Sequence, residues 1–417
     1  MNAAQLSLAS LLLLLAAAPA AAQTAPAGKD GWTQELSLAL HGGAYDGLGA
    51  REVAGGFAEV EAKLTPELRL GVWRLSLPLA LDHVQRFGHE VTPAPGQTLS
   101  LNETRGEAGV RVENRAHRLV RWSLAGSVFG ARKADWPDLY QRNAAGEYRA
   151  TDRYGFLAWD AGAGLWLQPA AKQFLRLDYR YARYDFAEDP NYDPLADPNH
   201  LTPGDRDLHR FEMSWRILSD AYLMAFELAT SRQESFDQLA RDAGTGSTHY
   251  ATNPNPSQVL VEVEPSVEVQ LRRLGGRAEV SFRYGYELQS DTFQGSYSYG
   301  WQNPRLAAAV DLTERLSGDL RVEAWLREYG PDSKNPAALE DGQGRWDRRG
   351  EVRARLRYAL AGSLSLVGQA QYVVRSTNYP DYVPGVYPAP PRDEFEYYDI
   401  GWDFTNVAAF VGVEYRR

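Results

Sequence analysis

The chain consists of stretches in which apolar and polar residues alternate, joined by connections that are alternately short and long. The stretch 278–289 shows this best, because one face carries Ala278, Val280, Phe282, Tyr284, Tyr286 and Leu288, and the other carries Glu279, Ser281, Arg283, Gly285, Glu287 and Gln289. Successive side chains of a β-strand point to opposite faces, so one face suits hydrocarbon and the other suits water. Sixteen such stretches can be counted, and we allow a range of 14 to 18.

The connections indicate how these strands are joined. Short turns are expected at 65–67, 115–117, 169–172, 218–220, 274–276, 314–318 and 361–363, most with a Gly, Pro, Asp or Ser suited to a tight turn. Long connections are expected near 45–52, 87–102, 133–152, 187–205, 237–256, 292–302, 331–345 and 378–394. This pattern predicts an all-β fold, a transmembrane up-and-down antiparallel β-barrel of about 16 strands with short periplasmic turns and long extracellular loops.

One stretch departs from the regular alternation. Between Leu68 and Asp82 the apolar residues change phase, and a β-bulge near Gly71 would bring the two halves into register.

The first 22 residues read as a secretory signal peptide. An apolar run from Leu11 to Ala18 precedes Ala20-Ala21-Ala22, which suits a small-residue cleavage site. We expect a short periplasmic N-terminus at 23–31 and a barrel at 32–417, with neither a plug domain nor a helical-repeat arm. After the leader no apolar run is long enough for a transmembrane helix, so backbone hydrogen bonds would have to close between strands.

The outward rows suit lipid. Two of them are Val259, Val261, Val263, Pro265, Val267, Val269 and Leu271, and Val352, Ala354, Leu356, Tyr358 and Leu360. Aromatic residues lie toward strand ends, where interfacial girdles occur, namely Trp32, Trp122, Trp215, Tyr222 and Tyr372. The alternative is core packing in a soluble sandwich, which shares the alternation but not the regular asymmetry of the connections.

Composition removes several classes of function. The chain has no Cys, which excludes disulfides and thiolate metal sites, and its net charge of −10 argues against binding nucleic acid. The 7 His residues show neither the spacing of a metal pair nor a nucleophile motif. We therefore expect no enzyme activity, no cofactor and no metal site. Ca²⁺ binding by the Asp-rich stretch from Asp189 to Asp197 stays open, although this stretch lacks EF-hand spacing.

The inward rows are charged, and the two signs are unevenly distributed. Acidic residues gather at Glu262, Glu264, Glu268, Glu279 and Glu287, whereas basic residues gather at Arg353, Arg355 and Arg357, at Arg321 and Arg327, and at Arg176 and Arg180. Opposed acidic and basic walls would create a transverse field across a water-filled pore. Alternatively, the same groups form salt-bridge ladders that stiffen the wall, and the two interpretations can both be true.

Aromatic side chains suggest a possible cargo. Phe129, Trp166 and Trp325 are expected to face the lumen, and the connections 187–205 and 378–394 are rich in Tyr and Asp. Aromatic faces beside hydrogen-bonding groups hold sugar rings, although Tyr and Asp are also common in exposed loops.

The last strand carries Val407, Ala409, Val411, Val413 and Tyr415 on one face, and it resembles the C-terminal strand that the barrel-assembly machinery recognises, although Arg416-Arg417 follow. The whole pattern resembles bacterial outer-membrane barrels, both the plug-free barrels that export alginate, cellulose or poly-N-acetylglucosamine and the porins, in architecture only. That resemblance implies a channel for hydrophilic cargo in a Gram-negative outer membrane.

Export of a secreted polysaccharide is the first hypothesis for that cargo. A general or selective porin for small polar solutes is the alternative, and a closed structural or surface-interaction barrel is a third. The expected partners are outer-membrane lipids and lipopolysaccharide, the assembly machinery, and periplasmic polysaccharide-export components if the first hypothesis holds.

Overall fold

The computed structural model describes most of the chain after its first thirty residues. The described ranges are 31–48, 55–87, 89–90, 98–99, 102–134, 136–142, 148–151, 155–186, 205–240, 249–250, 253–274, 277–294, 298–329, 346–377 and 404–416. The expected signal peptide and almost all of the expected periplasmic N-terminus lie outside these ranges, as do nearly all of the Tyr- and Asp-rich connections. Within the described ranges, no helix is long and apolar enough to cross a membrane.

The described strands form one large sheet and three small hairpins. The sheet contains β1 (Gly31–Leu48), β2 (Gly55–Leu70), β3 (Trp73–Ser76), β4 (Leu79–Phe87), β7 (Asn102–Asn114), β8 (Val120–Ala134), β11 (Phe156–Ala170), β12 (Gln173–Phe186), β13 (Arg206–Leu218), β14 (Tyr222–Leu239), β17 (Ser257–Leu274), β18 (Ala278–Asp291), β19 (Tyr299–Asp311), β20 (Leu316–Tyr329), β21 (Trp346–Ala361), β22 (Leu364–Thr377) and β23 (Phe404–Arg416). The hairpins are β5 (His89–Glu90) with β6 (Thr98–Leu99), β9 (Trp136–Arg142) with β10 (Tyr148–Thr151), and β15 (His249–Tyr250) with β16 (Asn253–Pro254).

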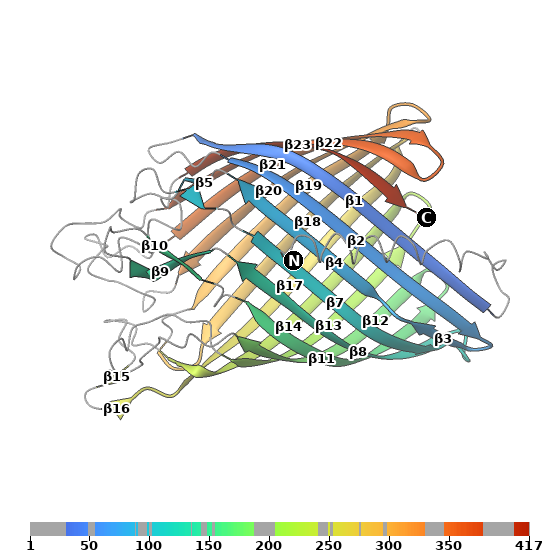
Figure 1. Ribbon diagram of the computed structural model, residues 1–417. Coiled ribbons are helices and arrows are strands. Elements are labelled where there is room, and N and C mark those ends of the chain that lie inside the picture. Colours follow the sequence, from blue (N-terminus) through green and yellow to red (C-terminus); the bar gives the residue numbers. More distant parts are fainter. Residues whose placement is uncertain are drawn as a thin grey trace.

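The large sheet closes on itself. Apart from β3 and β4, which each pair with β2 and β7, the strands of this sheet pair antiparallel with their neighbours in sequence. β1 also pairs with β23, with Ser37 opposite Arg416 and Leu48 opposite Thr405. The sheet has 17 strands, but β3 and β4 lie end to end between β2 and β7, so there are sixteen places around the barrel. The predicted fold class and strand number are therefore confirmed (Figure 1).

The first short turn, between β2 and β3, differs from the prediction. The expected turn at Thr65-Pro66-Glu67 lies inside β2, and the chain turns instead at Gly71-Val72, where Gly71 has a φ of 56°. Gly71 is thus a turn residue and not a bulge, because glycine adopts a positive φ without steric cost. The irregularity lies further on, between β3 and β4, where the amide of Leu77 donates to the Pro66 carbonyl at 2.9 Å and the amide of Gly109 donates to the Pro78 carbonyl at 2.8 Å.

The other connections follow the predicted alternation. Short turns join β7 to β8, β11 to β12, β13 to β14, β19 to β20 and β21 to β22, and Gly362 in the last of them has a φ of 54°. The three small hairpins all occur in expected long connections, at the opposite end of the barrel (Figure 1). The start of β1 and the end of β23 lie at the short-turn end, as in outer-membrane barrels, whose short turns face the periplasm.

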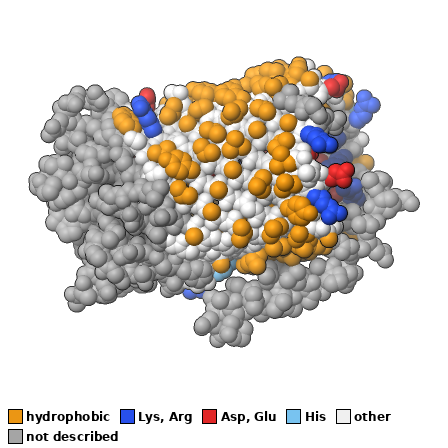
Figure 2. All heavy atoms as spheres, turned by 90° about the horizontal axis from the view of Figure 1, so that it is seen from above, with side chains coloured by type: hydrophobic (Ala, Val, Ile, Leu, Met, Phe, Trp, Pro, Cys, Tyr) orange, Lys and Arg blue, Asp and Glu red, His pale blue; other side chains and the backbone are white. Residues whose placement is uncertain are grey.

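The outer surface carries the apolar rows. Leu356 is 54% exposed and Val263 is 36% exposed, and Val411 on the last strand is more exposed still. Figure 2 shows apolar side chains spread over this face of the barrel, with charged side chains mainly toward one end. The expected girdle residues Trp32, Trp122, Trp215, Tyr222 and Tyr372 are exposed too. A closed barrel with an apolar outer surface and both ends at the short turns is the architecture of Gram-negative outer-membrane proteins, and it locates the chain in that membrane.

Candidate functional site in the barrel lumen

The strand register places the predicted lumen residues on the inward face. On β21, for example, Arg353, Arg355 and Arg357 alternate with the exposed Val352, Leu356 and Tyr358. The same alternation applies on the other strands and places inward Phe129, Trp166, Arg176, Arg180, Glu262, Glu264, Glu279, Glu287, Arg321, Trp325 and Arg327.

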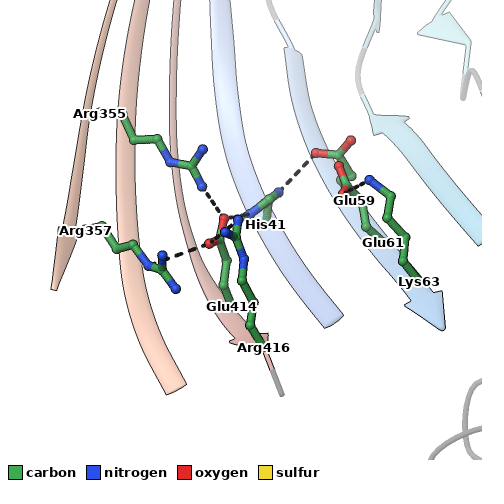
Figure 3. Close-up of polar contacts among 8 residues, drawn as sticks. All are labelled: His41, Glu59, Glu61, Lys63, Arg355, Arg357, Glu414 and Arg416. Carbon is green, nitrogen blue, oxygen red and sulfur yellow. Dashed lines mark hydrogen bonds and ion pairs between the residues drawn. The ribbon is translucent and has the colours of Figure 1, made fainter. Parts of the chain in front are cut away.

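The arginine row on β21 is anchored by two buried glutamates. Glu351 is 4% exposed and lies 3.2 Å from Arg349 Nη2 and 2.7 Å from Arg353 Nη2. Glu414 on β23, also 4% exposed, pairs with Arg355 and lies 4.0 Å from Arg357 Nε and 3.4 Å from Arg416 Nη2 (Figure 3). Five guanidinium groups thus share two carboxylates, and 5 − 2 leaves an excess of three positive charges on this wall.

The ion pairs of Arg355 and Arg357 on β21 with Glu414 on β23 pass over β22. Ser365 and Val367, which face inward from β22, are 4% and 1% exposed. The ladders therefore stiffen the wall, as the alternative interpretation proposed, and still leave unneutralised charge beside the lumen.

The acidic row on β17 and β18 is only partly neutralised. Glu264 accepts two hydrogen bonds from Arg210, at 3.2 and 3.3 Å, whereas Glu262 accepts from Ser231 Oγ at 2.8 Å. Glu279 accepts from Gln270, and Glu287 accepts from Tyr299 Oη at 2.6 Å. Among the described lysines and arginines, none forms an ion pair with Glu262, Glu279 or Glu287, so this wall keeps an acidic excess.

The two walls do not face each other. Only β19 and β20 separate the acidic strands from β21, so the acidic and basic rows are near neighbours around a sixteen-place barrel. The expectation of opposed walls was wrong because the order of strands follows the order of the chain, and rows close in sequence stay close around the wall. The field therefore runs along one part of the wall, from β18 to β21.

An arginine lies over each of the three predicted lumen aromatics. The Cζ of Arg180 is 5.5 Å from the ring centre of Phe129, that of Arg121 is 5.5 Å from Trp166, and that of Arg349 is 4.7 Å from Trp325. Cation–π contacts of this kind hold the guanidinium group against the wall and cover a face of the ring.

A cluster at the closing seam was missed by the sequence analysis. The ring of His41 on β1 is buried, with Nδ1 3.2 Å from Glu59 Oε2 and Nε2 3.7 Å from Glu414 Oε1. One potential ligand atom from each of His41, Glu59 and Glu61 lies within 4.8 Å of the others, yet Lys63 Nζ is 3.4 Å from Glu61 (Figure 3). Pairing β1 with β2 and β23 in sequence would have placed these side chains together.

The wall from β12 to β20 contains a cavity of about 380 Å³. Four arginines line it, Arg176, Arg210, Arg216 and Arg283, together with five carboxylates, Asp178, Glu212, Glu227, Glu264 and Glu287. Trp301 and Trp325 also line it. Such a mixed lining offers both signs of charge to a small dipolar solute.

Comparisons with known proteins identify no family for this chain. No family model matches it, and no curated protein matches it. Solved structures that resemble it include OccAB4 of Acinetobacter baumannii, with 8% identity and a TM-score of 0.46 over 94% of this chain and 100% of that one. OpdK of Pseudomonas aeruginosa, solved with vanillate, has 9% identity and a TM-score of 0.46 over 92% of this chain and 99% of that one. OmpT of Vibrio cholerae has 11% identity and a TM-score of 0.42 over 93% of this chain and 99% of that one. Similarity at this level supports no inference about the solute. Any such inference has to rest on the residues that line the lumen.

Proposed function

We propose that this chain is a passive outer-membrane channel for small charged or dipolar solutes. A sixteen-stranded barrel is wide enough to leave an aqueous passage, whose selectivity is set by the groups that line it. The observation that carries the proposal is the ionised lining: arginines and carboxylates occupy the inward positions, with a basic excess on β21 to β23 and an acidic excess on β17 and β18.

The same lining gives no support to polysaccharide export. A conduit for glycan would offer bare aromatic faces on which sugar rings stack. Here a guanidinium group covers a face of Phe129, Trp166 and Trp325, the three rings expected to serve that purpose. Paired charges along the wall suit solutes that carry charge themselves.

Two partners belong to this proposal. The outward apolar row of β23, with Val411 and Val413 exposed, supports recognition of the last strand by the barrel-assembly machinery. The apolar outer surface supports contact with membrane lipid and lipopolysaccharide.

Liposome swelling tests the proposal. Proteoliposomes containing the folded barrel should swell quickly in isotonic solutions of small organic ions or amino acids, and slowly in solutions of neutral oligosaccharides of several units. Equal or faster swelling with the oligosaccharides would contradict it. In the source bacterium, deletion of the gene should reduce uptake of small charged solutes and leave surface glycan unchanged, whereas loss of the glycan would restore the export hypothesis.

A further inference from the structure

A second cavity lies in the lumen wall, near the short turns. Its volume is about 480 Å³, and its lining comes from β2, β3, β7, β8, β11 and β12. Five arginines line it, Arg74, Arg111, Arg115, Arg121 and Arg176, but only two carboxylates do, Glu113 and Asp178. It shares Arg176 and Asp178 with the first cavity, so the two linings meet at these residues.

Three of the five arginines are neutralised. Arg74 pairs with Glu67, which lies outside the lining, and Arg115 pairs with Glu113 at 2.8 Å. Arg176 Nη2 donates to Asp178 Oδ1 at 3.1 Å. Glu67 also pairs with Arg69, at 2.8 Å, so it is not a counter-ion for Arg74 alone. Even if its whole charge is counted with the two lining carboxylates, 5 − 3 leaves an excess of at least two positive charges in the cavity.

The excess belongs to Arg111 and Arg121. Arg111 Nη2 donates to Ser123 Oγ at 3.4 Å, and the guanidinium group of Arg121 lies over Trp166. Neither arginine forms an ion pair with a carboxylate in the part of the chain that the structure describes. Because stacking on a ring uses the face of a guanidinium group, the N–H groups at the edge of Arg121 stay available to an acceptor.

The remaining lining groups suit an anion. Thr65, Ser76 and Ser123 bring hydroxyl groups that can donate hydrogen bonds to oxygen. Gly164 provides the space that Ser123 and Asp178 occupy, since a Cβ there would lie 2.8 Å from Ser123 Oγ and 2.7 Å from Asp178 Oδ1. Guanidinium groups and hydroxyls together match the geometry of a carboxylate or a phosphate.

We propose that this cavity binds a small oxyanion, a carboxylate or a phosphate, on the periplasmic side of the channel. This inference rests on the proposed channel function, because a solute reaches the cavity through the channel. It adds to that function the class of solute, a small oxyanion. The first cavity has four arginines against five carboxylates, so an anion would prefer the second. A solute with one anionic group would therefore leave the mixed wall and bind at Arg111 and Arg121 before release.

Calorimetric titration of the folded, detergent-solubilised barrel tests the proposal, with succinate and inorganic phosphate as separate probes in a low-salt buffer without chloride. The wild type should bind at least one of them, and the double variant Arg111→Gln with Arg121→Gln should bind it at least about tenfold more weakly, because hydrogen bonds to charged groups are lost. Arg348→Gln is the matched control. It removes another arginine that lies over a tryptophan, Trp346, from the outward face of β21, and it should leave the affinity unchanged.

If only succinate binds, the ligand class of the cavity is a carboxylate. If only inorganic phosphate binds, the ligand class is a phosphate. The proposal is overturned if the folded wild type binds neither anion, or if the double variant and the control weaken binding equally. These results are separate from the test of the channel. A barrel that conducts but binds no anion retains the channel function without this site, and one that binds anions but does not conduct retains the site without the channel.

Discussion

At the scale of single residues, the glycines of the closing seam have the strictest steric requirement among the glycines that the structure describes. His41 packs against Phe410 with ring centres 4.9 Å apart and lies between Glu59 and Glu414. A Cβ at Gly412 would lie 2.3 Å from His41 Cδ2 and 2.5 Å from the carbonyl oxygen of Leu40. The absence of a side chain at Gly412 therefore allows β1 and β23 to pair beside this ring.

Gly412→Ala should weaken closure of the barrel. Overpacking of this kind costs about 1 to 3 kcal/mol, and we expect a lower midpoint for loss of the compact, heat-modifiable form on SDS gels. Gly368→Ala is the control, because a Cβ at Gly368 meets nothing within 4 Å. Equal midpoints for the two variants would show that the seam tolerates the methyl group.

Arg357→Gln should make the channel less selective for anions. Arg357 is the most loosely held arginine of its row, at 4.0 Å from Glu414, which keeps Arg355 and Arg416 as partners, so folding should be unaffected. Removing one of three excess positive charges should shift the zero-current potential in a KCl gradient toward cation selectivity. An unchanged potential would mean that this guanidinium group does not face the permeating ion.

At the scale of strands and turns, alternation predicted which residues face lipid and which face the lumen, because it follows from strand geometry alone. The turn between β2 and β3 was misplaced because Pro66 is a turn-forming residue by propensity. Inside β2 its carbonyl instead accepts the hydrogen bond of Leu77, at the break between β3 and β4. The arginines over Phe129 and Trp166 and the two cavities could not be predicted, since they depend on side-chain contacts across strands.

The two faces of β17 should respond differently to an added charge. Val263→Arg, on the outward face, should lower the free energy of unfolding in lipid by about 2 to 4 kcal/mol if the residue lies near the bilayer midplane. Gln270→Arg, on the inward face, should cost little, because Gln270 already donates to Glu279, which would gain an ion pair. Urea titration of tryptophan fluorescence in liposomes measures both variants. A larger loss for Gln270→Arg would contradict the assignment of the faces.

At the scale of the whole molecule, the chain is a closed barrel whose wall separates charge by position. Basic excess lies on β21 to β23 and again around Arg111 and Arg121, with acidic excess on β17 and β18 between them. The net charge of −10 conceals this arrangement, since it sums over residues inside and outside the lumen. If the proposed channel function holds, a passage lined in this way would discriminate among solutes by the distribution of their charge.

Conductance of the purified barrel in a planar lipid bilayer tests the central claim most directly. Insertion of folded wild-type protein should produce discrete, lasting steps of current, and Arg357→Gln should give steps with shifted ion selectivity. Folded barrel that inserts without any current would contradict the account, because the lumen would then be closed and its charges would serve only to hold the wall together.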